Sequence, residues 1–178
     1  MRSNSKQKYL FLDIDGVLNH EDWFLNARSQ GLRSPHFWFD PECVKRVNRI
    51  LEETKATLVI SSSWRSDPKL SEQFAEVGLP ASFDSTIGMG HSWKLGYTIR
   101  GEEIDHYLKE HDIDIHSKHR YVILDDDSDF TPWQKKNTLF RTAASVLDEP
   151  YMKNNGSGLT DELTERIIKY LSYESKRH

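Results

Sequence analysis

Cysteine and long hydrophobic runs are scarce in this sequence. Cys43 is the only cysteine among 178 residues, which excludes an internal disulfide and is typical of a reducing compartment. No apolar run approaches the roughly 18 residues that cross a bilayer, and the opening residues MRSNSKQK lack the apolar core of a signal peptide. We therefore expect a soluble, cytoplasmic protein that is not associated with membranes.

Charge of one sign is not in excess either. The sequence has 24 Lys and Arg against 28 Asp and Glu, a net charge of -4, so no global positive field attracts nucleic acid or anionic membranes. A local basic patch remains compatible with this balance. The length suits a single domain over residues 1–178, which buries roughly 70 % of its unfolded surface. We expect frayed ends at residues 1–7 and 173–178.

Short apolar runs alternate with amphipathic segments along the chain. The predicted helices include one capped by Asp40, one capped by Asp67 and ended by Gly78, and one capped by Thr160. The predicted strands are too apolar for a sheet with one wet face, so the pattern favours an α/β fold with a central parallel sheet covered on both sides. These runs are KYLFLD, ATLVISS, YVILDD, STIG and TLFRT, and the expected loops are residues 19–39, 79–99 and 143–159.

Polar side chains follow three of these strands at the point where each ends. Asp13 and Asp15 follow the first, SSSWR follows the second, and DDDSD ends the third. The carboxyl ends of parallel strands meet at one edge, where ligands bind, so the carboxylates form an oxygen cluster suited to magnesium. A solvated turn is the alternative for Asp13 and Asp15. A calcium loop fits poorly, because Phe130 and Lys136 stand where that loop needs Gly and Glu.

The segments DIDGV, VISSSWR and ILDDDSD, in this order, resemble the haloacid dehalogenase (HAD) superfamily. SSSWR, RGEEI and GLT further resemble small members found beside RNA-repair and phage enzymes. The resemblance implies a three-layer Rossmann-like fold with a minimal cap, and a magnesium-dependent phosphatase. Nucleophilic Asp13 would form an aspartyl-phosphate, and Asp15 would act as general acid and base. Magnesium would bind Asp13, the Asp15 backbone carbonyl and a late acid.

The resemblance leaves several assignments open. Ser62 is favoured over Ser61 for binding a phosphoryl oxygen, and Arg100 over Lys94 as the cation that steadies the aspartyl-phosphate. Asp125 is the first choice for the late metal ligand. Asp126 follows it, and Asp129 is a supporting acid. The remaining residues that we expect around the substrate are Gly16, which lets the chain turn off the strand, Arg65, Ser61 and Lys94.

The expected substrate is a phosphate monoester of a nucleotide or a nucleic-acid end. Residues 19–39 and 79–99 are too few for a cap domain, and an open site favours a large substrate or closure by oligomerisation, so the oligomeric state stays open. Loop aromatics such as Trp23, Phe24 and Trp93 could stack bases or simply pack their own loops. The rivals are a phosphoprotein phosphatase and a catalytically silent phosphate-binding module, whereas dehalogenation gives Asp15 no task.

A zinc site is disfavoured. Four histidines lie between residues 106 and 119, but structural zinc sites usually carry cysteine or closely paired ligands, and these side chains span a predicted helix and a linker. We therefore assign no metal role to His106, His111, His116 and His119.

Overall fold

A parallel sheet forms the centre of the molecule, which a computed structural model describes over residues 7–88, 99–142 and 158–173. The sheet has five strands in the order β3-β2-β1-β4-β5, and every neighbouring pair is parallel. The α/β prediction is thereby confirmed. The strands are β1 (Tyr9–Leu12), β2 (Thr57–Ile60), β3 (Asp84–Ser85), β4 (Tyr121–Asp125) and β5 (Leu139–Arg141).

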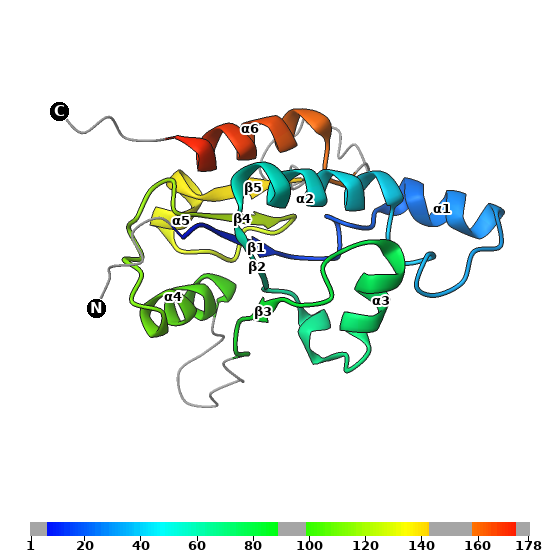
Figure 1. Ribbon diagram of the computed structural model, residues 1–178, viewed down its shortest axis with the longest axis horizontal. Helices are drawn as coiled ribbons and strands as arrows, with labels where there is room; N and C mark the ends of the chain where they lie inside the picture. The colour runs from blue at the N-terminus through cyan, green and yellow to red at the C-terminus, as the bar shows by residue number, and fades with distance from the viewer. Residues whose placement is uncertain (1–6, 89–98, 143–157, 174–178) are drawn as a thin grey trace.

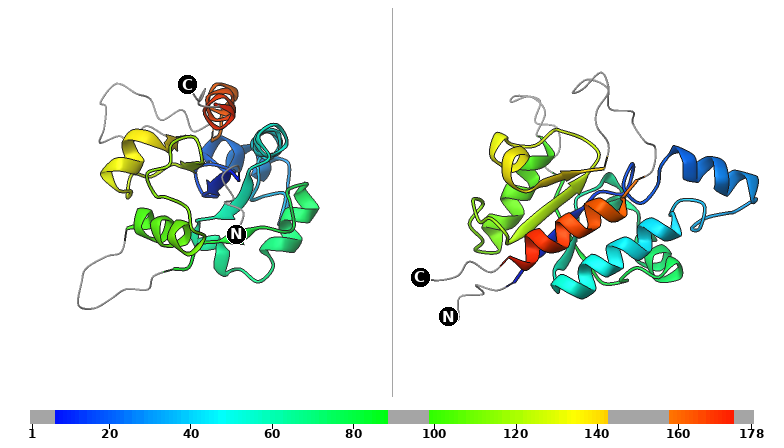
Figure 2. Two further views of the ribbon diagram at one scale, coloured as in Figure 1. Left: turned by 60° about the vertical axis from the view of Figure 1, so that its left-hand side comes forward. Right: turned by 90° about the horizontal axis from the view of Figure 1, so that it is seen from above.

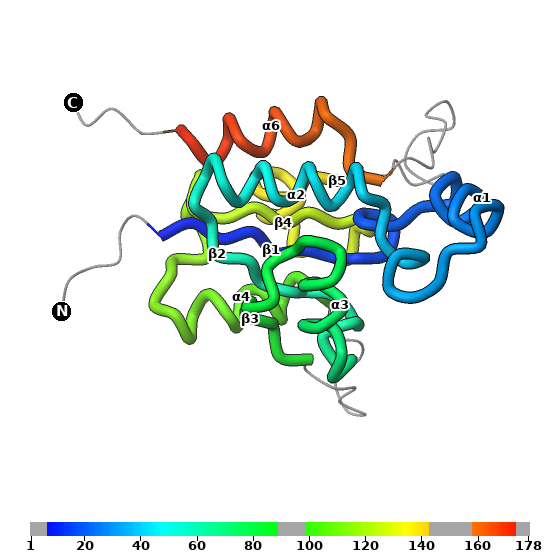
Figure 3. Tube along the Cα trace, turned by 45° about the vertical axis from the view of Figure 1, so that its right-hand side comes forward, coloured from blue at the N-terminus to red at the C-terminus, as the bar shows by residue number. Residues whose placement is uncertain are grey.

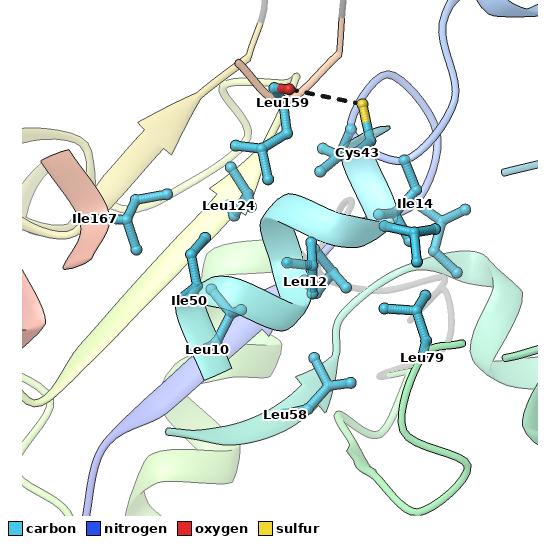
Figure 4. Close-up of a cluster of buried hydrophobic side chains, with 14 of the residues drawn as sticks. Leu10, Leu12, Ile14, Cys43, Ile50, Leu58, Leu79, Leu124, Leu159 and Ile167 are labelled. Carbon is cyan, nitrogen blue, oxygen red and sulfur yellow. Dashed lines mark hydrogen bonds between the residues drawn. The ribbon is translucent and has the colours of Figure 1, made fainter. Parts of the chain in front are cut away.

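Alternate residues of β1 point to opposite faces of the sheet, and both faces are covered. Leu10 and Leu12 belong to a core cluster with α2 (Pro41–Thr54) and α6 (Asp161–Ser172), and these two helices lie side by side over one face (Figures 1 and 2). Figure 4 shows this cluster around Leu12 and Ile50. Tyr9 and Phe11 belong to a second cluster with α4 (Arg100–Glu110). Burial on both faces explains why β1, β2 and β4, at the centre of the sheet, carry almost no polar residues.

Three of the four predicted helix ends, including the end at Gly78, agree with the structure, and one differs. Asp40 caps α2 by accepting from the Glu42 N–H, and Thr160 caps α6. The expected cap at Asp67 is wrong, because a 3-10 turn over Ser63–Ser66 precedes it and α3 (Leu70–Val77) begins later. The Asp67 carboxylate instead accepts from the Lys69 N–H and the Gln73 side chain. It therefore stabilises the turn that leads into α3.

The expected loop at residues 19–39 contains a helix, which corrects the sequence interpretation. Helix α1 (Glu21–Ser29) buries only Trp23 and Ala27, too few apolar residues for a recognisable repeat, and its cap is His20, which is not a usual capping residue. A second unexpected helix, α5 (Pro132–Asn137), begins with a capping box. Figures 1 and 3 show α1 projecting beyond the carboxyl ends of the strands.

Parts of the other expected loops lie outside the described residues. Those parts are residues 89–98, which include Trp93, Lys94 and Tyr97, and residues 143–157; residues 1–6 and 174–178 of the expected frayed ends also lie outside. The STIG segment contributes only the end of β3, which covers two residues. Within the described residues, every helix is too short or too polar to cross a membrane.

Candidate active site

Three carboxylates converge at the carboxyl edge of the central strands. Asp13 directly follows β1, Asp125 ends β4, and the Asp13 N–H donates to the Leu124 carbonyl at 3.0 Å, which continues the ladder to this edge. Oxygen atoms of Asp13, Asp125 and Asp126 lie within 4.8 Å of one another. Asp13 and Asp125 are buried. The parallel sheet therefore brings together acids that are more than a hundred residues apart in the sequence.

Arg100, the first residue of α4, reaches into this carboxylate cluster. Its Nη1 atom lies 2.5 Å from Asp125 Oδ2 and 3.3 Å from Asp13 Oδ1. The backbone N–H of Arg100 donates to Asp129 Oδ2 at 3.2 Å, so Asp129 fixes the start of the helix that carries the cation. Burial lowers the pKa of Arg100, but Asp125 and Asp13 outweigh burial and the net shift is upward. The guanidinium is therefore permanently charged.

One guanidinium does not neutralise three carboxylates. Burial raises the pKa of Asp13, although Arg100 opposes the shift, and burial together with the Asp13 charge raises the pKa of Asp125. Burial and Asp125 likewise raise the pKa of Asp126. The three oxygen donors retain an excess of negative charge that a divalent cation would relieve. Hard carboxylate oxygens are the ligands that Mg²⁺ prefers, so this donor set fits magnesium.

Gly16 makes room for one of these acids. A Cβ atom on Gly16 would lie 2.2 Å from Asp126 Oδ2, and the residue has a φ of +73°, which side chains other than glycine rarely adopt. The sharp turn that the sequence predicts is present. Its role extends beyond the turn itself, because the bare backbone allows Asp126 to approach the end of β1.

The Asp15 carboxylate is held by two side chains. Asn19 Nδ2 donates to Asp15 Oδ1, and Trp64 Nε1 donates to Asp15 Oδ2, both at 2.9 Å. Neither Asn19 nor Trp64 is assigned a role from the sequence. The Asp15 side chain is exposed and lies outside the three-acid group. It is thus positioned as a separate carboxylate beside the cluster, which suits proton transfer better than metal binding.

The two candidate serines both lie next to Asp13 in the fold but differ in their contacts. The Ser62 hydroxyl is within hydrogen-bonding reach of Asp13 and lowers the pKa of that carboxyl, and its Oγ accepts from the Trp64 N–H at 3.4 Å. Ser61 is fully buried, and its Oγ has no hydrogen-bond partner among the described residues. An unpaired buried hydroxyl is costly. The Ser61 hydroxyl therefore remains able to donate a hydrogen bond to a ligand, whereas the Ser62 hydroxyl already contacts Asp13.

Arg65, a further predicted basic residue, has its partners outside this cluster. Arg65 pairs with Glu103 at 3.1 Å and donates to Thr86 Oγ1 at 3.2 Å. These contacts tie the turn after β2 to α4 and to the end of β3. Lys94 lies outside the described residues. Arg100, the favoured cation for the aspartyl-phosphate, does contact Asp13.

The comparison with known families agrees with this geometry. The family described as HAD domain in Swiss Army Knife RNA repair proteins matches residues 9–149, a range that includes the carboxylate cluster and Arg100. No curated protein and no solved structure matches the chain. The matched range covers most of the sequence and confirms the resemblance seen in its three motifs. The chain belongs to the HAD domains of the Swiss Army Knife RNA-repair type.

Proposed function

We propose that this protein is a magnesium-dependent phosphohydrolase that acts through an aspartyl-phosphate on phosphate monoesters of nucleic-acid ends or nucleotides. One observation carries the proposal: buried Asp13 lies between the Arg100 guanidinium and the Ser62 hydroxyl, within 4.8 Å of two further carboxylates. This arrangement supplies a nucleophile together with groups that neutralise phosphoryl oxygens. The RNA-repair family favours nucleic acid as the substrate.

Asp13 and Asp15 act one after the other in the proposed reaction. An Asp13 carboxylate oxygen attacks phosphorus, the bond from phosphorus to the ester oxygen breaks, and Asp15 donates a proton to the leaving oxygen. Asp15 then takes a proton from water, whose oxygen attacks the same phosphorus. The bond between phosphorus and Asp13 breaks, and inorganic phosphate and free Asp13 result. Asn19 and Trp64 orient Asp15 for both transfers.

The other site residues hold the transferring group. Arg100 donates to phosphoryl oxygens, and the Ser61 or Ser62 hydroxyl donates a further hydrogen bond. Asp13, Asp125 and Asp126 would hold Mg²⁺, which would neutralise phosphoryl charge and allow Asp13 to approach an anionic substrate. The upward pKa shifts of these three acids are what such a cation would reverse.

Hydrolysis of an aryl phosphate and of phosphorylated oligonucleotides, with and without Mg²⁺, tests the proposal. We expect magnesium-dependent turnover by the intact protein and a loss of more than about 10³-fold in the Asp13→Asn variant. Asp127→Asn is the matched control, because Asp127 is exposed and lies outside the three-acid group, and we expect it to retain turnover.

Three outcomes would reject parts of the proposal. Bound magnesium without turnover on any of these substrates would indicate a phosphate-binding module of the same fold. Phosphopeptides that outperform oligonucleotides by orders of magnitude would indicate a phosphoprotein phosphatase. Turnover that survives Asp13→Asn would remove Asp13 from the role of nucleophile.

A further inference from the structure

One face of helix α1 lines a cavity beside the candidate acid and base. Glu21, Phe24, Leu25 and Arg28 follow the i, i+3, i+4, i+7 spacing of a single helix face, and all four line a cavity of about 580 Å³ that Asp15 also lines. The rest of the lining is Gly16, Asn19 and His20. The opposite face carries Trp23 and Ala27, which are buried. The helix is thus anchored on one side and presents the other to the cavity.

The anchoring contacts make α1 a fixed wall. Trp23 Nε1 donates to the Phe37 carbonyl at 3.1 Å, and the Trp23 N–H donates to His20 Nδ1 at 3.2 Å. The Phe24 and Phe37 rings are stacked with centroids 5.6 Å apart. A cavity wall that is already ordered loses little conformational entropy when a ligand binds.

Two groups on this face, Leu25 and Arg28, make no ring contact or ion pair in the described part of the chain. Leu25 is 59 % exposed, and Arg28 is exposed and forms no ion pair with any residue in the described part of the chain. Both side chains line the cavity and are therefore available to a ligand bound there. Arg28 follows Glu21 by seven positions, so at 1.5 Å per residue it lies about 10 Å along the helix from its start.

The order of chemical groups along this wall matches a nucleic-acid strand. If Asp15 protonates the leaving oxygen, the leaving group lies in the cavity that Asp15 lines. Glu21 can only accept hydrogen bonds, so it suits a hydroxyl or amino group, while Phe24 and Leu25 suit the apolar surface of a sugar and base. Arg28, farther along, suits a phosphodiester. A mononucleotide has no second phosphate to reach that position.

We propose that the α1 face binds the end of a nucleic-acid strand, with Phe24 and Leu25 against the terminal nucleoside and Arg28 on the neighbouring phosphodiester. The inference rests on the proposed function and adds to it that the substrate has at least two nucleotides. It makes Arg28 a determinant of specificity that does not contact the reacting atoms.

Turnover of a phosphorylated dinucleotide, a mononucleotide and an aryl phosphate in the wild type, Arg28→Gln and Arg33→Gln tests this site. Arg33 is the matched control, because it is exposed in the same connection but does not line the cavity. We expect the ratio of dinucleotide to aryl-phosphate kcat/KM to fall about fivefold in Arg28→Gln and to stay constant in Arg33→Gln. The salt dependence of dinucleotide kcat/KM should weaken by about 0.7 in logarithmic slope.

A binding measurement separates this inference from the chemistry. Fluorescence anisotropy of a labelled, phosphorylated tetranucleotide on the Asp13→Asn background, with and without Arg28→Gln, reports the contact whether or not the protein turns over. We expect about fivefold weaker binding with the second substitution. If aryl-phosphate turnover is absent but this difference remains, the proposed reaction fails and the α1 site stands.

Three results would overturn the α1 site. The first is equal kcat/KM for the mononucleotide and the dinucleotide in the wild type. The second is a fall of the same size for all substrates in Arg28→Gln, which would indicate a general structural defect. The third is an Arg28 dependence that appears only with acidic phosphopeptides, which would make a phosphoprotein the occupant.

Discussion

In the part of the chain that the structure describes, two separate clusters each bring three possible metal ligands together, and the net pKa shifts of their carboxyl groups have opposite directions. One is the carboxylate cluster of Asp13, Asp125 and Asp126, and the other is the group of His20, Asp40 and Cys43, whose potential ligand atoms also lie within 4.8 Å of one another. Distance alone would make either one a candidate metal site. Their hydrogen bonds and charges distinguish them.

The His20 group is satisfied internally. Asp40 accepts from His20 Nε2 at 2.7 Å and from the Glu42 N–H at 2.9 Å, while His20 Nδ1 accepts from the Trp23 N–H. The two side chains thereby cap α2 and α1 and join them. Burial, followed by the Asp40 charge, raises the pKa of Cys43 to about 12, and the thiol contacts the Leu159 carbonyl (Figure 4). The thiol stays protonated and the Asp40 carboxylate is already hydrogen-bonded to His20 and Glu42, so the contacts within the group account for its ligand atoms without a metal ion.

The direction of the net pKa shift distinguishes the His20 group, which joins α1 to α2, from the carboxylate cluster, which is the candidate metal site. Burial raises the pKa of Asp40, but hydrogen bonds from His20 and Glu42 more than offset it, and the net shift is downward. The net shift is upward for all three acids of the carboxylate cluster. Surplus negative charge that the fold does not neutralise is a cost in stability that a ligand can remove.

Among the predictions that compare the two groups, substitution of Arg100 should give the largest change in the free energy of unfolding. We expect Arg100→Met to lower the free energy of unfolding by about 3 kcal/mol, because the substitution leaves neighbouring buried carboxylates without their cation. Urea denaturation at pH 7 without divalent cations measures this loss. Added Mg²⁺ should stabilise the variant more than it stabilises the wild type, because the cation replaces part of the missing charge.

Arg46→Met is the matched control for this substitution. Arg46 pairs with Asp161, whose side chain is 76 % exposed, so we expect a loss below about 1 kcal/mol and no added response to Mg²⁺. An equal loss in the two variants would show that the carboxylate cluster is solvated and carries no surplus charge to be relieved.

Substitution of Asp40 tests the second group, in which hydrogen bonds already stabilise the carboxylate. We expect Asp40→Ala to lower the free energy of unfolding by about 1 to 2 kcal/mol, because it removes the cap of α2 and the partner of His20. Asp40→Asn should lose less, since asparagine also caps helices. The lowered pKa means that the folded state prefers the carboxylate, so its contribution is present above the unfolded-state value of about 3.9 and is lost as pH falls through the folded-state pKa.

The pH dependence is the decisive part of this measurement. Urea denaturation from about pH 7 down to pH 3 should show the difference between wild type and Asp40→Asn shrinking in acid. A difference that stays constant over this range would mean that the ionised form is not preferred and that Asp40 acts only through its hydrogen-bonding shape.

The convergence of Asp13 and Asp125 could be predicted from the sequence, because strand-end residues of a parallel sheet meet at one edge, whereas Arg100 is predicted only by the family resemblance. Helix α2 could be predicted equally well, since Asp40, Pro41 and a regular apolar face all agree. These features depend on local sequence patterns and on the parallel topology that the alternation of predicted strands and helices indicates. Thr131 and Gln134 form a capping box with the same kind of local signal, so α5 could have been found as well.

Other parts of the site depend on tertiary side-chain contacts that no local sequence pattern predicts. Helix α1 was missed because two buried residues do not make a period, and its packing against Phe37 is a tertiary contact. The close approach of Asp126 to Gly16 joins residues that are distant in sequence. The same holds for Trp64, whose reach to Asp15 depends on the turn after β2.

Trp64→Phe should give the smallest effect, and it tests whether the contact with Asp15 matters for proton transfer. Phenylalanine keeps ring contacts like those of Trp64 with Trp38 and Phe39 but loses the N–H that reaches Asp15. A hydrogen bond of about 1 kcal/mol corresponds to about a fivefold fall in kcat. That fall should occur with alkyl phosphates, whose leaving oxygen needs a proton, and should nearly vanish with aryl phosphates, whose leaving group does not.

Trp133→Phe, in α5 and against Tyr121, is the control. Because a purely structural Trp64 would lower kcat for both substrate types alike, the dependence on leaving group identifies it as a positioning residue.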